Sequence, residues 1–140
     1  MGAASTRVST ANDSGHGGLQ MLIGAGPARF VADEPVENGG LGLGPTPYDL
    51  VAAGLAACTA MTLRLYVKRK GWALGAVHVA VSHRRDPQAT PADHFTRRIT
   101  LVGDVDDEKR GRLIEIANKC PIHRLLTAGV TVETILTPAV

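Results

Sequence analysis

The sequence predicts a single α+β domain, and three of its features together lead to this prediction. A helical stretch runs without interruption from Pro47 to Lys70, apolar and polar residues alternate in segments around it, and a shorter amphipathic stretch ends near Cys120. With 140 residues, of which 44% are hydrophobic and 20% charged, the chain can bury one ordinary core, and no change in composition divides it. We therefore expect one domain over residues 1–140, with a loosely ordered N-terminal segment at residues 1–17.

The first regular elements are two short strands. Apolar runs at Leu19–Ile23 and Ala28–Ala32 are separated by a glycine and proline turn at residues 24–27, which predicts an antiparallel hairpin. A glycine-dense loop follows at Asn38–Pro45. This loop lacks the Lys-Ser/Thr ending of a phosphate-binding loop, so we expect no nucleotide site there.

The long helix has clear boundaries in the sequence. Thr46 can cap it, Pro47 suits the first helical position, and Asp49 can bond back to the cap, while Gly71 ends it after three basic residues. Small residues fill its first half, which predicts a central, buried helix that another backbone approaches closely. Its apolar run ends at Arg64, short of the about 20 apolar residues that a bilayer-spanning helix needs. We expect no membrane partner.

The second half of the chain alternates between strand and helix patterns. Val77–Val81 and the segment from Phe95 to Leu101 have a period of two and predict a second antiparallel hairpin. Acidic residues at 104–108 then favour a helix start, and Pro121 predicts that this helix ends near Cys120. Renewed alternation at Val130–Leu136 predicts a last strand.

Charge and targeting patterns exclude several classes of function. The net charge is +2 and the basic residues are dispersed, which is not the pattern of a nucleic-acid-binding surface. Because no basic stretch precedes an apolar one at the N-terminus, we expect a cytoplasmic protein whose cysteines are kept reduced. The myristoylation pattern at Met1–Thr6 and the glycosylation sequon at Asn12–Ser14 are short enough to arise by chance.

The first of the two cysteines, Cys58, lies in the middle of the long helix. The helix dipole acts within the first turn and does not reach it, and its neighbours three and four positions away are uncharged. An inert core cysteine is one interpretation. Activation instead requires a cation from another segment, for which the open candidates are Arg29, His83, Lys119 and His123.

The second cysteine, Cys120, lies where the chain turns at Pro121, with His123 three residues later. A Cys-x-x-His pair is half of a zinc site, but no second close pair accompanies it, so we expect neither a metal nor another cofactor. Two thiols at the core edge of two different helices can instead form a reversible disulfide, which is the chemistry of a thiol peroxidase.

The cysteine contexts resemble those of a known family. The motifs at Gly44–Leu50, Ala56–Cys58 and Lys119–Arg124 look like those of the OsmC/Ohr family of osmotically induced and organic-hydroperoxide-resistance proteins, and the similarity extends from about Leu19 to Leu136. The resemblance implies an α+β fold with antiparallel sheets packed on a long central helix, in an intertwined homodimer. It also implies that Cys58 is the peroxidatic cysteine and that Cys120 resolves the oxidised intermediate, with a small hydroperoxide as substrate and an external dithiol as reductant.

One position departs from the pattern of the family's peroxidases. Tyr48 stands where the resemblance implies a glutamate that orients an arginine onto the reactive sulfur, and Asp49 lies on a different face of the helix. The arginine is not in the matching region at residues 10–15, and Arg7 and Arg29 lie on either side of it. The alternative function is therefore a non-enzymatic dimer that binds a small apolar ligand or senses redox state through the same thiols.

Overall fold

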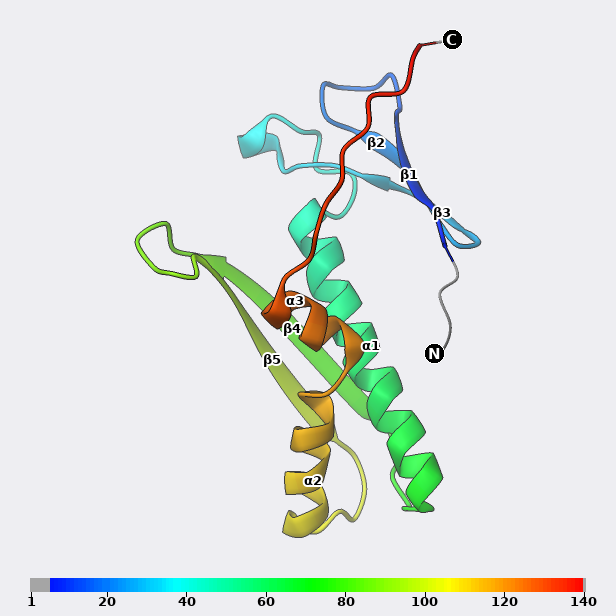
Figure 1. The fold of residues 1–140 in the computed structure, drawn as a ribbon, viewed down its shortest axis with the longest axis vertical. Helices are drawn as coiled ribbons and strands as arrows, with labels where there is room; N and C mark the ends of the chain where they lie inside the picture. The colour runs from blue at the N-terminus through cyan, green and yellow to red at the C-terminus, as the bar shows by residue number, and fades with distance from the viewer. Residues whose placement is uncertain (1–5, 140) are drawn as a thin grey trace. The chain divides into compact units, whose positions relative to one another are not determined.

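A computed structural model describes residues 6–139, which divide into two compact units at Ala52 and Ala53. The first unit contains β1 (Ser9–Asp13), β2 (Met21–Ala25), β3 (Ala28–Ala32), the short 3-10 helix η1 (Val36–Asn38) and the start of α1 (Pro47–Lys70). The second contains the rest of α1, followed by β4 (Val77–Arg85), β5 (Asp93–Leu101), α2 (Asp107–Ala117) and α3 (Pro121–Ala128) (Figure 1). The predicted α+β class is confirmed. Residues 1–5, which begin the N-terminal segment and the myristoylation pattern, lie outside the described residues.

The first unit is built on a three-stranded antiparallel sheet in the order β1-β2-β3. The predicted hairpin is confirmed as β2 and β3, which pair from Met21 with Ala32 to Ala25 with Ala28, and Gly26 supplies the positive φ of the turn between them. Strand β1 corrects the expectation of loose order for the part of residues 1–17 that it occupies. Its side chains are exposed and, apart from Ala11, polar, so the sequence shows no apolar alternation that would predict the strand, which is held by backbone pairing with β2.

The glycine-dense loop is held by one buried carboxylate. Asp33 accepts hydrogen bonds from the backbone N–H groups of Glu34, Leu41 and Leu43, at 2.8, 3.2 and 3.4 Å. At Gly44 an added Cβ would lie 2.1 Å from the carbonyl oxygen of Val31, so the loop passes against β3 where only glycine fits. The loop therefore delivers the chain to the start of α1 along a fixed path.

Replacing Asp33 with alanine should lower the free energy of unfolding by about 2 kcal/mol, because three part-buried backbone hydrogen bonds to its carboxylate would lose their acceptor. Asp33→Asn retains one acceptor oxygen and should lose less. Urea denaturation measures both changes, with Glu37→Ala, an exposed acid in the same segment, as the control. Equal midpoints for Asp33→Ala and Glu37→Ala would show that the carboxylate does not anchor the loop.

Helix α1 has the boundaries that the sequence predicts. The N–H of Thr46 donates to the Asp49 carboxylate at 2.9 Å, and the N–H of Asp49 donates to the Thr46 hydroxyl at 3.1 Å, which is a reciprocal capping box. At the other end Gly71 takes a positive φ of 68°, and its N–H bonds to the carbonyl of Lys68.

The side chains of α1 are buried along one face only. Leu55, Thr59, Leu63 and Val67 recur every four residues and are all buried. Apolar side chains elsewhere on the helix are in water, and Met61, for example, is 66% exposed. The expectation of a buried helix is therefore correct for one face of α1 and wrong for the rest. By length and mean hydropathy, 1.6 over its most apolar window, α1 could cross a bilayer, a property it shares with the core helices of soluble proteins.

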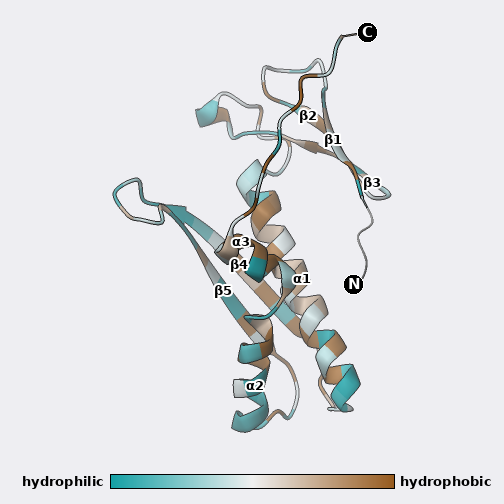
Figure 2. Ribbon diagram, in the orientation of Figure 1, coloured by the Kyte–Doolittle hydropathy of each residue, from teal (hydrophilic) through white to brown (hydrophobic). Residues whose placement is uncertain are grey.

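The core of the second unit joins α1 to α2 and to the hairpin of β4 and β5. The hairpin is confirmed, with Val77 opposite Leu101 and Arg85 opposite Asp93. The buried cluster consists of Leu63, Val67, Val105, Leu113, Ile116 and Ala117, and partly buried residues of both strands pack on it. Figure 2 shows that apolar residues recur along α1.

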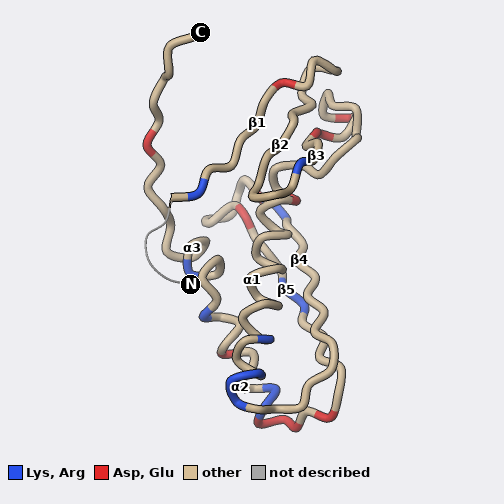
Figure 3. The backbone as a smooth tube through the Cα atoms, turned by 90° about the vertical axis from the view of Figure 1, so that its right-hand side faces the viewer, with Lys and Arg blue, Asp and Glu red and all other residues tan. Residues whose placement is uncertain are grey.

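Helix α2 begins as the acidic residues predict. The Asp106 side chain accepts the N–H of Lys109 at 2.8 Å, and Asp107 and Glu108 occupy the first turn, where negative charge is favourable. Figure 3 shows these acidic residues gathered where the chain enters α2. The helix ends at Ala117, just before Cys120, as predicted.

The C-terminal part of the chain differs from the prediction in two ways. Pro121 does not only end one helix; it occupies the first position of α3, an element that the sequence analysis does not contain. The expected strand at Val130–Leu136 is wrong for this chain by itself, because these residues form no ladder with any other described segment and Leu136 is 96% exposed. An alternating pattern becomes a strand only where a neighbouring strand supplies hydrogen bonds and an apolar face.

Candidate functional site

The candidate site is centred on the part of the second unit where α1, β5 and α3 meet. Cys58 lies in the middle of α1 as a half-buried free thiol. Among the described residues, no hydrogen bond or ion pair reaches its sulfur, so none of the four cations proposed from the sequence is bonded to it in this chain. The residue as a whole is only partly buried.

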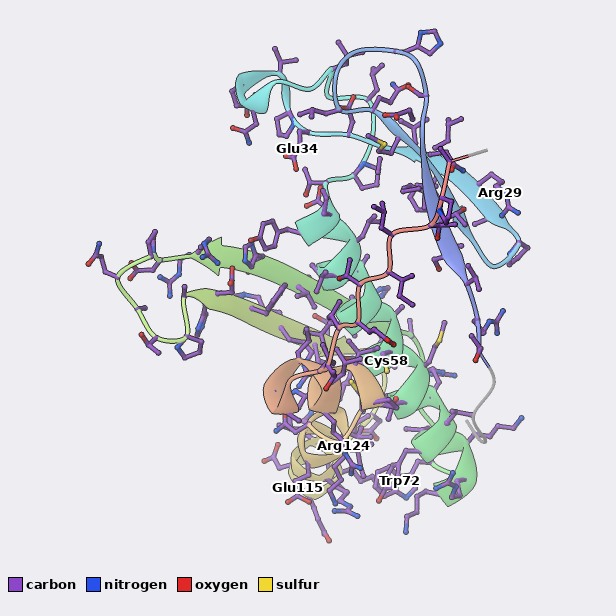
Figure 4. All side chains as sticks on the ribbon, turned by 45° about the horizontal axis from the view of Figure 1, so that its top comes forward. Arg29, Glu34, Cys58, Trp72, Glu115 and Arg124 are labelled. Atoms are coloured by element: carbon purple, nitrogen blue, oxygen red, sulfur yellow. The ribbon has the colours of Figure 1, made fainter. Side chains whose placement is uncertain are left out.

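Cys120 is a fully buried free thiol at the N-cap position of α3. Its sulfur accepts the backbone N–H of His123 at 3.3 Å and lies 3.8 Å from the hydroxyl of Thr59. Thr59 directly follows Cys58, so the start of α3 lies beside the turn of α1 that carries Cys58, the region labelled in Figure 4. The fold thus brings the neighbourhoods of the two predicted site residues together from positions far apart in the sequence.

A polar side chain that sequence reasoning missed connects these elements. Arg97 of β5 donates through Nη1 to the Thr59 hydroxyl at 3.0 Å and to the Ala117 carbonyl at 3.3 Å, and the same nitrogen lies 4.0 Å from the Cys120 sulfur. Through Nη2 it donates to Asn118 Oδ1 at 2.8 Å and bonds His123 Nδ1 at 3.2 Å. One guanidinium therefore bonds to groups of α1, of the end of α2, of the connection that follows α2, and of α3.

The signal for Arg97 is present in the sequence. With a period of two, position 97 shares a strand face with Phe95, Ile99 and Leu101, which are the apolar residues of β5. A charged residue in the middle of an apolar face must be buried with polar partners. The pair Arg97-Arg98 is easily interpreted instead as ordinary surface charge, and in the structure only Arg98 is exposed.

Three of the cations proposed from the sequence as partners of Cys58 bond to other groups. Burial, together with the nearby charge of Arg97, lowers the pKa of His123 below its ordinary value of 6.5, so this imidazole is neutral near pH 7. His83 bonds the Asp93 carboxylate at 2.8 Å, and this bond, with one from Arg85, lowers the pKa of Asp93. Arg29 donates to carbonyl groups of its own hairpin turn.

The lowered pKa of His123 predicts a pH dependence of stability. The unfolded histidine, with a pKa near 6.5, binds protons more readily than the folded one. The contribution of neutral His123 to the free energy of unfolding is therefore fully present above pH 6.5 and is lost as the pH falls through the pKa of the folded state. His123→Gln should therefore flatten the fall in the free energy of unfolding between about pH 7 and pH 5. Urea titrations across this range measure it, with the exposed His78→Gln as control. If His78→Gln flattened the curve and His123→Gln did not, the assignment would be wrong.

No group of three or more His, Cys, Asp or Glu side chains that could hold a metal ion occurs among residues 6–139. The Cys-x-x-His pair instead uses its cysteine sulfur as a helix cap and its imidazole as a partner of Arg97. The expectation of a site without metal or cofactor stays a prediction.

The comparisons with known proteins decide the family. Residues 39–135, more than half of the chain, match the family model described as OsmC-like protein. The chain belongs to the OsmC-like family. The resemblance on which the sequence analysis depends is therefore confirmed, and both cysteines lie within the matched region. Among the curated proteins compared, none matches this OsmC-like chain.

Solved structures support the same fold for this OsmC-like protein. The organic hydroperoxide resistance protein OhrB of Bacillus subtilis is 27% identical, with a TM-score of 0.57 over 87% of this chain and 90% of that chain. An organic hydroperoxide resistance protein from Elizabethkingia anophelis, with thiocyanate bound, is 25% identical, with a TM-score of 0.65 over 89% of each chain. A Legionella pneumophila protein named as the organic hydroperoxide resistance protein OsmC is 22% identical, with a TM-score of 0.67 over 89% and 91%.

The departure at the start of α1 has a structural counterpart in this OsmC-like protein. Tyr48 occupies the position where the resemblance implies a glutamate, and the neighbouring Asp49 uses its carboxylate to accept the N–H of Thr46. Asp49 therefore serves as a helix cap. Among residues 6–139 no arginine forms an ion pair with its carboxylate.

Proposed function

We propose that this OsmC-like protein is a thiol-dependent peroxidase that reduces small organic hydroperoxides, with Cys58 as the reacting thiol and Cys120 as the resolving thiol. The observation that carries the proposal is the placement of the Cys120 sulfur against Thr59, the residue after Cys58, with both thiols free. Membership of the OsmC-like family and similarity to proteins named for organic hydroperoxide resistance support it.

The proposed reaction has three steps. The Cys58 thiolate attacks the distal oxygen of the hydroperoxide, and the O–O bond breaks. This leaves Cys58 as a sulfenic acid, and the alkoxide takes a proton and leaves as an alcohol. The Cys120 sulfur then attacks the Cys58 sulfenic acid, and its proton leaves with the sulfenic oxygen as water, which gives a Cys58–Cys120 disulfide. An external dithiol returns both thiols by two exchange steps.

The exposure of the two thiols supports this division of roles. Cys58 is half-buried, whereas Cys120 is fully buried behind Thr59 and the start of α3. A hydroperoxide in solution can therefore reach Cys58 more easily. Cys120 becomes reactive toward a partner only once the oxidised sulfur lies beside it.

We further propose that the protein works as a homodimer, because a single chain leaves much apolar surface in water. The strand pattern at residues 130–136 has no partner among the described segments, and a second copy would supply one (Figure 2 shows its apolar residues). The large apolar side chains that are more than half exposed in α1 and this segment are Met61, Leu65, Val130, Val132, Ile135 and Leu136. Sedimentation equilibrium tests this: Ile135→Asp should shift a dimer toward the monomer.

The experiment for the proposed function compares substrates under steady-state conditions. Reduced protein with an excess of a dithiol should consume cumene hydroperoxide faster than hydrogen peroxide, because apolar side chains such as Leu55 and Met61 lie one turn from Cys58. Consumption no faster than that of the same concentration of free cysteine would contradict the proposal. A reducing cytoplasmic compartment suits this cycle, and neither nucleic acid nor membrane takes part in it.

The alternative function is a dimer that senses redox state or binds a small apolar ligand. Because Tyr48 and the capping role of Asp49 leave the implied arginine-glutamate pair incomplete, a redox-sensing or apolar-ligand-binding dimer would use the same thiols with slow peroxide turnover. Slow peroxide consumption combined with a disulfide that forms and reverses readily would favour this alternative over the peroxidase.

A further inference from the structure

We infer that Arg97 is a positioning residue for the closing of the Cys58–Cys120 disulfide, which it assists by holding the Cys120 sulfur in place and by placing a positive charge beside that sulfur during the attack. The inference rests on the proposed function for the roles of the two thiols. It concerns a residue of β5, distant from both cysteine motifs in the sequence.

The surroundings of Arg97 lack an anion. The guanidinium bonds the Thr59 hydroxyl, the Ala117 carbonyl, the Asn118 amide oxygen and the His123 imidazole, all of which are neutral near pH 7. Within residues 6–139 no carboxylate forms an ion pair with it. Arg97 is partly buried, so its charge is less screened than at the open surface, and the group beside it that can become negative is the Cys120 thiol, 4.0 Å away.

The start of α3 supplies a second, independent contribution. Cys120 is the N-cap residue of an eight-residue helix, and its sulfur accepts the N–H of His123 at 3.3 Å. Negative charge is favoured at this end of a helix, and thiolates are favoured there and beside arginine. Both contributions act on the same sulfur from different elements. Among the described residues, no comparable hydrogen bond acts on the Cys58 sulfur.

The contacts of Arg97 also fix the geometry of the attack. Its Nη1 bonds Thr59, whose hydroxyl in turn donates to the Leu55 carbonyl at 2.7 Å, so the turn of α1 that carries Cys58 is tied to the same guanidinium. Its Nη2 bonds Asn118 and His123 on either side of Cys120. Removing the guanidinium would therefore loosen the approach of one sulfur to the other and remove the charge that favours the attacking anion.

An aromatic disulfide tests this step without any hydroperoxide. With 2,2′-dithiodipyridine, Cys58 should form a mixed disulfide and release one thiopyridone, and Cys120 should then displace the second thiopyridone to close the protein disulfide. The first phase reports the reactivity of Cys58, and the second reports the attack by Cys120. Stopped-flow absorbance of the thiopyridone follows both phases.

We expect Arg97→Met to slow the second phase about tenfold or more, since it loses charge-assisted contacts to the sulfur and its neighbours, while the first phase stays unchanged. Arg97→Lys, which retains the charge without the planar fork, should recover part of the rate. The matched control is Arg98→Met, the exposed neighbour on the same strand, which should leave both phases unchanged. Arg97→Gln replaces Arg97→Met in the comparison if the methionine variant does not fold.

The inference would be overturned if the second phase of Arg97→Met (or of Arg97→Gln, if that variant replaces it) were as fast as in the wild type. It would also be overturned if the second phase of Arg97→Lys were no faster than that of the uncharged variant. Equal slowing of both phases would indicate a general structural role and would also overturn it. The proposed function is judged separately. If the second phase depends on Arg97 but cumene hydroperoxide is not consumed, the peroxidase proposal fails while the role of Arg97 stands.

Discussion

Cys58→Ser should abolish hydroperoxide reduction, whereas Cys120→Ser should complete one turnover and then stop. A serine hydroxyl at position 58 cannot form a sulfenic acid, so no step of the proposed reaction can begin. Without Cys120 the first step still releases one equivalent of alcohol, and the Cys58 sulfenic acid then waits for an external thiol or oxidises further. The measurement is the amount of alcohol released per protein in a single-turnover reaction with cumene hydroperoxide and no dithiol.

Each variant serves as the control for the other, because each retains one of the two thiols. Trapping with dimedone should label Cys58 in the Cys120→Ser variant and give no label in Cys58→Ser. If both variants lost the first turnover equally, the division into a reacting and a resolving thiol would be wrong. If Cys58→Ser still produced alcohol, Cys120 would be the reacting thiol.

Leu63→Ala should destabilise this protein more than Asp33→Ala does. Leu63 is completely buried in the cluster that joins α1 to α2, and removing its side chain beyond Cβ leaves a cavity among Val67, Leu113 and Ala117. We expect the free energy of unfolding to fall by about 3 kcal/mol. Urea denaturation measures the change, and hydroperoxide assays should be made at a temperature where the variant stays folded.

Leu63→Met is the matched control for this prediction. It retains the side-chain volume and the apolar character and should cost less than about 1.5 kcal/mol. If Leu63→Ala cost no more than Leu63→Met, Leu63 would not be packed as the structure places it.

Helices and hairpins whose boundaries depend on residues close together in the sequence could be predicted from the sequence alone. The capping box at Thr46 and Asp49, with Gly71 at the other end, determines where α1 begins and ends. The hairpin of β4 and β5 follows from a period of two. The roles proposed for Cys58 and Cys120 start from their motifs and stay predictions. Each of these predictions needs only residues that are close in sequence.

The remaining features depend on partners that are distant in the sequence. Strand β1 is polar and exposed and exists because β2 offers a free edge, and α3 begins at a proline that also explains the end of the preceding helix. The bonds from Arg97 to Thr59 and His123 join residues 38 and 26 positions apart, so no local pattern contains them. The segment at 130–136 has a strand pattern that a single chain does not satisfy.

The central claim is that Cys58 and Cys120 come together to form one redox pair. Mass spectrometry after alkylation tests it most directly, on reduced protein treated with one equivalent of cumene hydroperoxide and then digested. We expect a single intramolecular Cys58–Cys120 disulfide that a dithiol reverses completely. Two alkylated, unoxidised cysteines after this treatment, or disulfides only between separate chains, would contradict it.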